Sequence, residues 1–481
     1  MNLAELLRHV PVLDVAGDVS RDVHRVTRDS RDVDVGSIFV AIQGSTFDGH
    51  DVVKSLGAVV SVVERPVEAA SGAVVVRVAD SRVALGQLAA ALHGWPARGL
   101  RVVGVTGTNG KTTVTTIVEH AWRAAGRRCA RVGTTGWSVD GEPRSTRFTT
   151  PEAPDLQSLL AELRDRDIER LAIEISSIGL SQHRVEGVQL QTAVFTNLTR
   201  DHLDFHGTFE EYRRAKARIF DLLRPTGGAP RALLCRDDPA WSVLGAPQDA
   251  WTYGRSTAAD VVIRSIRCGA EQMDISFRTP AGDTMVRTPL VGAFNALNLG
   301  AALGILLLDG LKLDEAAAAL GSVPGVPGRL EVVPNPRGVR VLVDYAHTDD
   351  ALAQVLGTVR EVTEGEVWVV FGCGGDRDAT KRSLMGGVAS RLADRVVVTS
   401  DNPRTEEPLH IIGDILSGIA DGVKVDVEPN REEAIRLAVS SAAPGDVVLI
   451  AGKGHETTQT IGTEVRPFDD RLVAARVGRG E

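Results

Sequence analysis

The segment from Val102 to Thr113, VVGVTGTNGKTT, constrains the fold of this chain more than any other. A β-branched apolar run leads into two glycines and then Gly-Lys-Thr-Thr, the pattern of a strand, a phosphate-binding turn and the start of a helix. The common loop of this kind, G-x-x-x-x-G-K-[ST], places a glycine where this chain has Val105. The available glycine, Gly107, instead lies only three residues before Gly110. The segment therefore predicts a nucleotide-binding α/β sheet with a shortened loop.

The length and composition predict a soluble globular protein with about three domains. The chain has 481 residues, of which 43% are hydrophobic and 24% charged, with 49 glycines. A formal net charge of -9 argues against a general nucleic-acid binder but allows local basic pockets for anions. Cys129, Cys235, Cys268 and Cys373 show no C-x-x-C spacing, so neither a zinc site nor a disulfide framework is indicated.

The start of the chain, MNLAELLRHVPVLD, lacks the basic and apolar regions of a signal peptide. No apolar run approaches the roughly 20 residues needed to span a bilayer, and AALGILLL is long enough only for a core helix. We therefore expect a cytoplasmic monomer without a membrane span.

Two breaks in the sequence divide it into three parts. Short β-branched runs alternate with Ala/Leu-rich stretches, which predicts an α/β fold with mainly parallel sheets. The segments HGWPARGLR and GSVPGVPGRLE interrupt this alternation with proline and glycine. We expect domains at 1–97, 98–325 and 326–481, the central one with a P-loop-type ATPase sheet and the last one Rossmann-like.

Six apolar strands are followed at once by polar or glycine-rich residues. They are RVVGVTG, RLAIEISS and TAVFTNLTRDH in the central domain, and VWVVFGCGGDRD, DRVVVTSDNPR and DVVLIAGKGHE in the last one. Ligands bind at the carboxyl ends of strands in parallel α/β sheets. Two domains that face each other with such strand ends predict a reaction in the cleft between them.

The loop and its neighbours supply the groups that phosphate and Mg²⁺ require. Gly107 and Gly110 free backbone N–H groups for phosphate, Lys111 adds a positive charge, Thr112 can ligate Mg²⁺, and the helix opening at Thr113 adds its dipole.

Further metal partners should come from adjacent strand ends, where Glu174 and His202 lie. Either residue alone is more typical of a buried, locally bonded polar group, but their position downstream of a phosphate loop favours a metal role. Lys216 falls on a predicted helix, where a lysine is normally a solvated charge.

These segments resemble the Mur ligases, the ATP-dependent amide-bond formers of peptidoglycan synthesis, whose loop has the short GTNGKTT form. The resemblance runs over nearly the whole chain, through TRDSRDVDVGSIFVAIQG, TTPEAPDLQ, EISSIGLSQHRV, TNLTRDHLDFHGTFEEYRRAK, VPGRLE, VDYAHT, FGCGGDRD, DNPRTEEP and AGKGHE. It is greatest to the members that add the third residue of the stem peptide to a UDP-muramoyl-dipeptide. Many ordered matches of this kind are highly specific.

The resemblance implies the following site residues. ATP would be bound by Gly107, Thr108, Asn109, Gly110, Lys111, Thr112 and Thr113, by Asn295 and Asn298 near the adenine, and by Arg329 and Asp344 over phosphate and ribose. Mg²⁺ would be held by Thr112 and Glu174, and a second Mg²⁺ by His202 and a carbamylated Lys216. The UDP-muramoyl-dipeptide would be bound by the N-terminal domain, through Ser30, and by five residues of the central domain, Thr149, Thr150, Ser176, Gln182 and Arg184. The incoming amino acid would contact Arg377, Asp401, Asn402, Pro403, Arg404, Gly452 and Glu456. Lys111, Lys216, His202, Glu174 and Arg329 would carry the catalysis.

The incoming amino acid can be predicted from SDNPRTEEP. Enzymes of this step add meso-diaminopimelate or L-lysine, which differ by one carboxylate at the far end. Pro403 restricts the backbone before Arg404, whose guanidinium can bind a carboxylate through two parallel hydrogen bonds. We therefore predict meso-diaminopimelate, with Asp401 and Glu456 receiving its distal ammonium group.

Four positions depart from the family pattern. Ile178 stands where histidine is usual and Phe148 where asparagine is frequent, while Ser383 and Asp349 stand where proline is usual. Phe148 and Ile178 border the nucleotide-sugar side, so a paralogue with another donor or amino acid remains an alternative. Folylpolyglutamate synthase is a second alternative, opposed by the DNPR and DSR segments. A catalytically idle binding module is the third, opposed by the intact Lys111.

Overall fold

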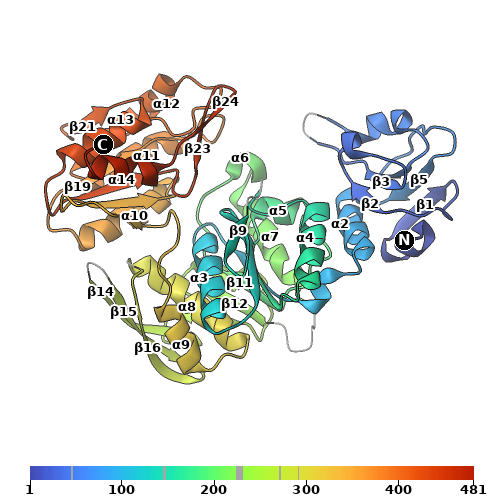
Figure 1. Cartoon of the computed structure of the whole chain (residues 1–481), viewed down its shortest axis with the longest axis horizontal. Coiled ribbons are helices and arrows are strands. Elements are labelled where there is room, and N and C mark those ends of the chain that lie inside the picture. Colours follow the sequence, from blue (N-terminus) through green and yellow to red (C-terminus); the bar gives the residue numbers. More distant parts are fainter. Residues whose placement is uncertain (45–46, 145–147, 224–230, 270–271, 291) are drawn as a thin grey trace.

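The computed structural model describes residues 1–44, 47–144, 148–223, 231–269, 272–290 and 292–481. Figure 1 shows a chain of three lobes, with the central lobe between the N-terminal and the C-terminal ones. Each lobe contains one large sheet, and we propose 1–97, 98–325 and 326–481 as the domains on this basis. Helices and strands alternate through most of the chain, so the predicted α/β class is confirmed.

The N-terminal lobe has a five-stranded sheet in the order β1-β5-β4-β3-β2. Its elements are α1 (Leu3–Leu6), β1 (Val12–Ala16), β2 (Arg25–Thr27), β3 (Ser37–Val40), β4 (Val60–Val63), β5 (Val74–Val78) and α2 (Ser81–Leu92). Strands β2 to β5 are parallel and β1 is antiparallel to β5. Helix α2 buries Leu85 and Leu88 against this sheet, and its other side faces the central lobe.

The central lobe has an eleven-stranded sheet in the order β16-β15-β14-β13-β12-β11-β6-β10-β7-β8-β9. The strands are β6 (Arg101–Thr106), β7 (Cys129–Gly133), β8 (Gly136–Val139), β9 (Glu142–Arg144), β10 (Arg170–Glu174), β11 (Thr192–Phe195), β12 (Arg231–Cys235), β13 (Trp251–Gly254), β14 (Val261–Cys268), β15 (Met273–Thr279) and β16 (Gly282–Thr288). The strands from β7 to β14 in this order are parallel, and antiparallel strands extend both edges.

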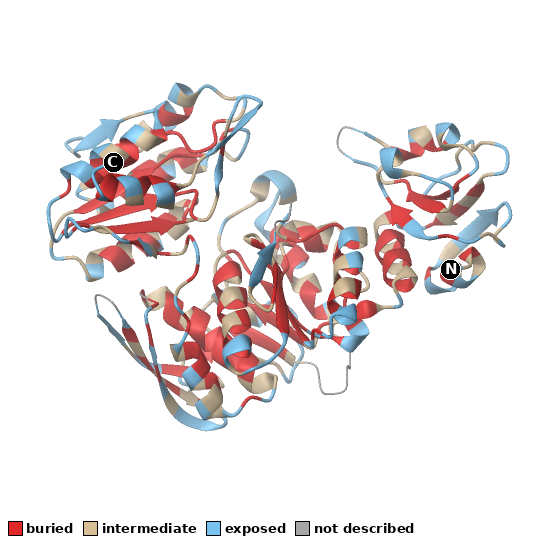
Figure 2. Cartoon of the chain, viewed as in Figure 1, coloured by how far each residue is buried: buried red, intermediate tan, exposed pale blue. Residues whose placement is uncertain are grey.

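Helices cover both faces of the central sheet. They are α3 (Lys111–Ala124), α4 (Ala153–Asp165), α5 (Ser177–Ser181), α6 (Leu203–His206), α7 (Phe209–Ala217), α8 (Ala293–Leu308) and α9 (Leu313–Gly321). Helices α3, α8 and α9 share one apolar cluster, while α4 and α7 contribute to another. Figure 2 shows the result as buried strands between helices whose outer sides are exposed. Buried strands of this kind need an apolar layer on each face.

The C-terminal lobe has a six-stranded sheet in the order β17-β18-β22-β19-β20-β21, and a separate hairpin. Its elements are β17 (Glu331–Val333), β18 (Arg340–Asp344), α10 (Asp349–Glu361), β19 (Val367–Phe371), α11 (Lys381–Leu392), β20 (Arg395–Val398), α12 (Pro408–Leu416), β21 (Val425–Val427), α13 (Arg431–Ser441), β22 (Val447–Ala451), β23 (Thr458–Ile461), β24 (Glu464–Pro467) and α14 (Asp470–Gly478). Strands β18 to β21 in this order are parallel, so their carboxyl ends meet at one edge.

All six strands with polar ends are present, as β6, β10 and β11 in the central sheet and β19, β20 and β22 in the C-terminal one. Within each sheet they are parallel neighbours, which brings their polar ends together. The segment AALGILLL lies inside the buried helix α8, as predicted. Among the described residues, none of the helices combines the length and the apolar character that crossing a membrane requires.

Candidate active site

The loop after β6 has backbone conformations that favour glycine. Gly107 has a φ of 148° and Gly110 a φ of 87°. A Cβ atom on Gly107 would lie 1.9 Å from the Thr196 hydroxyl at the end of β11, so a side chain does not fit there. Gly110 precedes the first residue of α3, whose amino end has unpaired backbone N–H groups. The loop therefore has the geometry of an anion-binding site.

Two lysine ammonium groups meet at the carbonyl oxygen of Gly107. Lys111 Nζ and Lys216 Nζ each donate to that oxygen at 2.8 Å, and Lys111 also donates to the Thr108 carbonyl at 2.8 Å. Lys216 lies on α7 with 1% of its surface exposed, its ammonium 4.4 Å from the centre of the Tyr212 ring. The usual expectation for a helical lysine, a solvated charge, is therefore wrong at this position.

Burial lowers the proton affinity of both lysines in this pair. It lowers the pKa of Lys111, and it lowers the pKa of Lys216 well below the usual range, with a further decrease from the positive charge of Lys111. The neutral amine is therefore a larger fraction of Lys216 than of a solvated lysine. A neutral amine is the form that can react with an electrophile.

Glu174 ends β10 beside the loop and is fully buried. Its Oε2 accepts hydrogen bonds from the Thr112 hydroxyl at 2.9 Å and the Thr134 hydroxyl at 3.1 Å, and its Oε1 accepts one from the Thr134 backbone N–H at 3.0 Å. A Cβ atom on Gly133 would lie 2.0 Å from Glu174 Oε1, so only glycine fits there. The carboxylate is held against the first residues of α3, as predicted from the strand end.

The other loop residues are fixed by neighbouring side chains. The Thr108 hydroxyl is 3.0 Å from the Tyr212 hydroxyl, and the backbone N–H of Asn109 donates to Asn197 Oδ1 at 2.8 Å. Thr113 is buried in the first turn of α3. These contacts hold the loop in one shape before any ligand enters, which reduces the ordering cost of binding.

Asn295 and Asn298 lie on the first turns of α8 beside the loop. Asn298 Nδ2 donates to Asn295 Oδ1 at 3.0 Å. Asn298 Oδ1 also lies so close to Gly110 that a Cβ atom there would be 2.6 Å away. The pair predicted for the adenine side therefore lies directly against the phosphate loop.

His202 is at the amino end of α6, and its φ of 53° changes the direction of the chain before that helix. Its Nε2 lies 3.4 Å from Asp201 Oδ2, and burial lowers its pKa despite that carboxylate. Within the described ranges, no three His, Cys, Asp or Glu side chains are grouped in a way that could hold a metal ion. A metal site here would therefore need other oxygen ligands besides Glu174.

Arg329 reaches across from the C-terminal lobe to the phosphate loop. Its Nη2 donates to the Thr112 hydroxyl at 3.3 Å, and its guanidinium lies 4.7 Å from the centre of the Tyr345 ring. Asp344 accepts the backbone N–H of Leu330 and of Ala346, each at 2.7 Å, and burial raises its pKa. Asp344 thus fixes the turn that carries Arg329.

Five of the six residues predicted for the donor substrate form one network. Arg184 donates to the Thr150 carbonyl at 3.1 Å and to Gln182 Oε1 at 2.7 Å. The Thr150 hydroxyl accepts the Ser176 backbone N–H at 3.0 Å, and the Thr149 hydroxyl is 3.0 Å from that of Thr134. The network adjoins Glu174, because the Thr150 hydroxyl donates to the Glu174 carbonyl at 3.0 Å.

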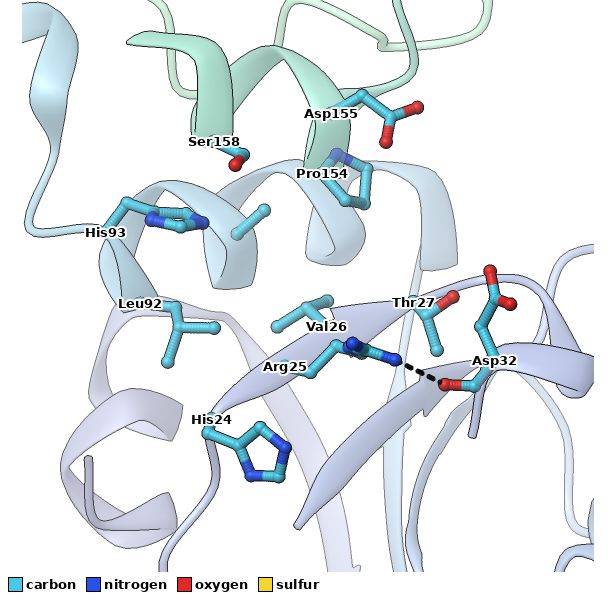
Figure 3. A pocket seen from close by; sticks show the side chains of 11 residues that line it. His24, Arg25, Val26, Thr27, Asp32, Leu92, His93, Pro154, Asp155 and Ser158 are labelled. Atoms are coloured by element: carbon cyan, nitrogen blue, oxygen red, sulfur yellow. Dashed lines mark hydrogen bonds between the residues drawn. The ribbon is translucent and has the colours of Figure 1, made fainter. Parts of the chain in front are cut away.

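Ser30 lies apart from this network, in a short 3-10 helix of the N-terminal lobe (Ser30–Asp32). Between it and the network is a cavity of about 460 Å³ lined by Arg28, Trp137, Phe148 and Glu152, among others. A second cavity of about 460 Å³ adjoins it, where β2 faces the ends of α2 and α4. Figure 3 shows this second cavity, in which Arg25 donates to the Asp32 carbonyl at 3.0 Å. The junction of the two lobes is therefore hollow and lined by both charged and apolar side chains.

Glu152, which no sequence motif indicated, pairs with arginines from both lobes. Arg184 lies 3.1 Å from its carboxylate, Arg28 3.4 Å and Arg82 3.8 Å. Three guanidinium groups therefore surround one carboxylate, while Asp29, Asp32 and Asp155 also line the adjoining cavities. No sequence signal indicated this cluster, because the four side chains come from separate segments.

The positions that depart from the family pattern have different surroundings. The Arg184 guanidinium lies 4.9 Å from the centre of the Phe148 ring, and Asp349 pairs with Arg200 of the central lobe at 3.3 Å. Ile178 is half-buried in α5. No contact explains Ser383 in α11.

The predicted amino-acid pocket lies where β19, β20 and β22 end. Arg404 has a φ of 52°, and its Nη1 donates to the Gly375 carbonyl at 2.7 Å. A Cβ atom on Gly375 would lie 1.9 Å from the Pro403 carbonyl, so the two strand-end loops touch through glycine. Arg377 is exposed in the same loop as Gly375. Both arginines therefore border one space.

Acidic groups lie after β20 and β22 at the same edge of the sheet. A Cβ atom on Gly452 would lie 2.6 Å from Asp401 Oδ2, so glycine lets that carboxylate approach the end of β22. Asn402 Nδ2 donates to Glu456 Oε2 at 2.9 Å. The same oxygen accepts a hydrogen bond from Lys453 at 2.8 Å, a contact that sequence analysis did not foresee.

Comparison with known families places matches along most of the chain. Residues 105–306 match the Mur ligase middle domain, residues 328–454 the Mur ligase glutamate ligase domain, and residues 22–93 the Mur ligase family catalytic domain. The three matches fall in the three lobes.

Individual relatives agree with these matches. The chain is 45% identical, over 98% of each chain, to UDP-N-acetylmuramoyl-L-alanyl-D-glutamate–2,6-diaminopimelate ligase of Geobacillus kaustophilus. A solved structure of a ligase of the same name is 32% identical over 100% of this chain and 99% of its own, with a TM-score of 0.71. Folylpolyglutamate synthase of Mycobacterium tuberculosis, solved with ADP, shares the fold at 20% identity and a TM-score of 0.64 over 77% of this chain and 91% of its own.

Proposed function

The chain belongs to the Mur ligase family, and from that premise we propose that it joins meso-diaminopimelate to UDP-N-acetylmuramoyl-L-alanyl-D-glutamate in an ATP-dependent reaction of peptidoglycan synthesis. The observation that carries this proposal is 45% identity, over 98% of both chains, to a ligase named for these substrates. The loop, the buried lysine pair and Glu174 supply the groups that such a reaction requires.

The first step activates the donor carboxylate. One of its oxygens attacks the γ-phosphorus of ATP, the bond from that phosphorus to the β–γ bridging oxygen breaks, and ADP leaves. Lys111, on the Thr108 carbonyl, and Arg329, on the Thr112 hydroxyl, would neutralise charge as it moves to the leaving phosphate. The product is an acyl phosphate.

The second step forms the amide. The amine of the amino acid, held at the C-terminal strand ends, attacks the acyl carbon, loses a proton, and phosphate leaves from a tetrahedral intermediate. Holding the two substrates next to each other accounts for much of the increase in reaction rate, because the donor and the amino acid bind to different lobes. Arg329 and the turn fixed by Asp344 link those lobes at the phosphate loop.

The residues at this site can supply oxygen ligands for two Mg²⁺ ions if Lys216 is carbamylated. Mg²⁺ prefers oxygen ligands, and Thr112 Oγ1 and Glu174 Oε2 lie 2.9 Å apart. Lys216 becomes an oxygen ligand only when its neutral amine adds to CO₂, forming an N–C bond and losing a proton, and its lowered pKa favours that reaction. Thr112 and Glu174 would hold one ion, and His202 and the carbamate a second. Bound Mg²⁺ would supply charge neutralisation for the phosphates.

Three alternatives have less support. Folylpolyglutamate synthase shares only the fold with this chain at 20% identity. An idle binding module would have no use for Lys111, Lys216 and Glu174 in contact with one loop. L-Lysine as substrate is opposed by Arg404, whose guanidinium borders the predicted pocket.

ADP release from purified protein tests the function directly. We expect ADP with ATP, Mg²⁺ and UDP-N-acetylmuramoyl-L-alanyl-D-glutamate only when an amino acid is added, and fastest with meso-diaminopimelate in a panel that includes L-lysine. Release that is independent of the amino acid, or fastest with L-lysine, would contradict the proposal.

The acyl-phosphate route predicts the fate of one oxygen atom. With ¹⁸O in the donor carboxylate, we expect one label in the released phosphate, because that oxygen forms the bond to phosphorus. Mass spectrometry of the phosphate measures it, and unlabelled donor with ¹⁸O-water is the control. Unlabelled phosphate, or AMP and pyrophosphate as products, would exclude this route.

A further inference from the structure

Lys453 is a fully buried lysine next to the predicted amino-acid pocket that no step of the proposed reaction uses. It follows β22, and its ammonium group donates to Glu456 Oε2 at 2.8 Å, to the Thr458 carbonyl at 2.7 Å and to Asn402 Oδ1 at 3.3 Å. All three N–H bonds of the ammonium therefore have a partner. The group ties together the ends of β20 and β22 and the start of β23.

This contact fixes the Glu456 carboxylate in one orientation. Oε2 accepts from both Lys453 and Asn402, and the Asn402 amide is itself fixed because its Oδ1 also accepts the Thr460 backbone N–H at 2.9 Å. Among the described residues, Oε1 of Glu456 accepts no hydrogen bond. One oxygen is thus saturated and the other left for an incoming N–H donor.

Lys453 also adds positive charge to the pocket. Asp401 and Glu456 interact electrostatically with the buried Arg431, and Arg377 and Arg404 interact with Asp376, so Lys453 adds one positive charge to a group that contains both signs. When its reacting amine is neutral, meso-diaminopimelate has two carboxylates and one ammonium, whereas L-lysine has one of each. The positive charge that Lys453 adds therefore favours the amino acid with the second carboxylate.

We infer that Lys453 is a positioning residue that orients Glu456 and selects an amino acid with a second carboxylate, an inference that rests on the proposed function. Lys453 does not touch the substrate. It acts through Glu456 and through the charge it adds behind the pocket.

Lys453→Met tests this inference, since methionine keeps the length of the side chain and removes its charge and hydrogen bonds. We expect KM for meso-diaminopimelate to rise by about tenfold or more, because a charge-assisted contact to the substrate is misplaced. The preference for meso-diaminopimelate over L-lysine in kcat/KM should fall, while KM for ATP stays unchanged. Lys424→Met, an exposed lysine of the same lobe, is the matched control and should change none of these values.

A double-mutant cycle separates positioning from a general structural role. If Lys453 acts through Glu456, then Glu456→Gln should cost less in the Lys453→Met background than in the unmodified protein. Should Lys453→Met fail to fold in a thermal scan, Lys453→Gln removes the same charge while keeping N–H donors, and the same loss of preference is expected.

Additive losses, or equal losses for ATP and for both amino acids, would overturn the inference while leaving the proposed function intact. Unmodified protein that releases no ADP with any amino acid would overturn the proposed function itself, and the inference with it.

Discussion

Lys216→Ala is expected to lower kcat by about 100-fold or more, a loss of the size seen when one charge-stabilising group of an active site is removed. The reason is the position of Lys216: its amine is buried, donates to the Gly107 carbonyl, and has a pKa far below the usual range. As a carbamate it would add a negative oxygen ligand near His202. Alanine removes that ligand, and coupled ADP release measures the loss.

Two further measurements distinguish a carbamate from a structural lysine. A small carboxylic acid such as acetate should partly restore the activity of Lys216→Ala, and removal of CO₂ should slow the unmodified protein. Lys312→Ala, an exposed lysine of the central lobe, is the control and should retain full activity. Near-normal turnover in Lys216→Ala would leave Lys216 with a packing role against Tyr212 only.

The parts of the site that lie at strand ends could be predicted from the sequence. Gly107, Glu174 and Asp401 each follow a short apolar run, and parallel pairing brings such ends to one edge of a sheet. Local pattern is sufficient for these residues because the strand dictates where its last residue lies. The same holds for Gly110, which the turn into α3 requires.

Contacts between distant segments could not be predicted in this way. Glu152 meets Arg28 and Arg82 from the N-terminal lobe, and the pairing depends on how two lobes pack. Lys453 was overlooked because a lysine between two glycines in a polar segment is typical of an exposed loop, yet it is fully buried and donates to three acceptors, one after β20 and two in the segment from Glu456 to Thr458. Burial of a charge depends on partners that no local pattern records.

The second large effect is expected at Arg404. We predict that the unmodified protein prefers meso-diaminopimelate over L-lysine, and that Arg404→Ala reduces this preference in kcat/KM by roughly 10- to 150-fold, the equivalent of about 1.5–3 kcal/mol for one charge-assisted contact. Steady-state kinetics with both amino acids measure the ratio. Arg466→Ala, which removes an exposed arginine from the neighbouring hairpin, is the matched control and should leave the ratio unchanged.

The geometry explains why this arginine should discriminate between the two substrates. Its backbone is held by a φ of 52° and by the N–H bond to the Thr460 carbonyl at 3.2 Å, so the side chain starts from a fixed point. One nitrogen, Nη1, donates to the Gly375 carbonyl, which leaves the other edge of the guanidinium for a carboxylate. Arg404→Lys should recover only part of the preference, because an ammonium group offers charge without the paired hydrogen bonds. A kcat/KM that favours L-lysine in the unmodified protein would refute the assignment of Arg404 and of the substrate together.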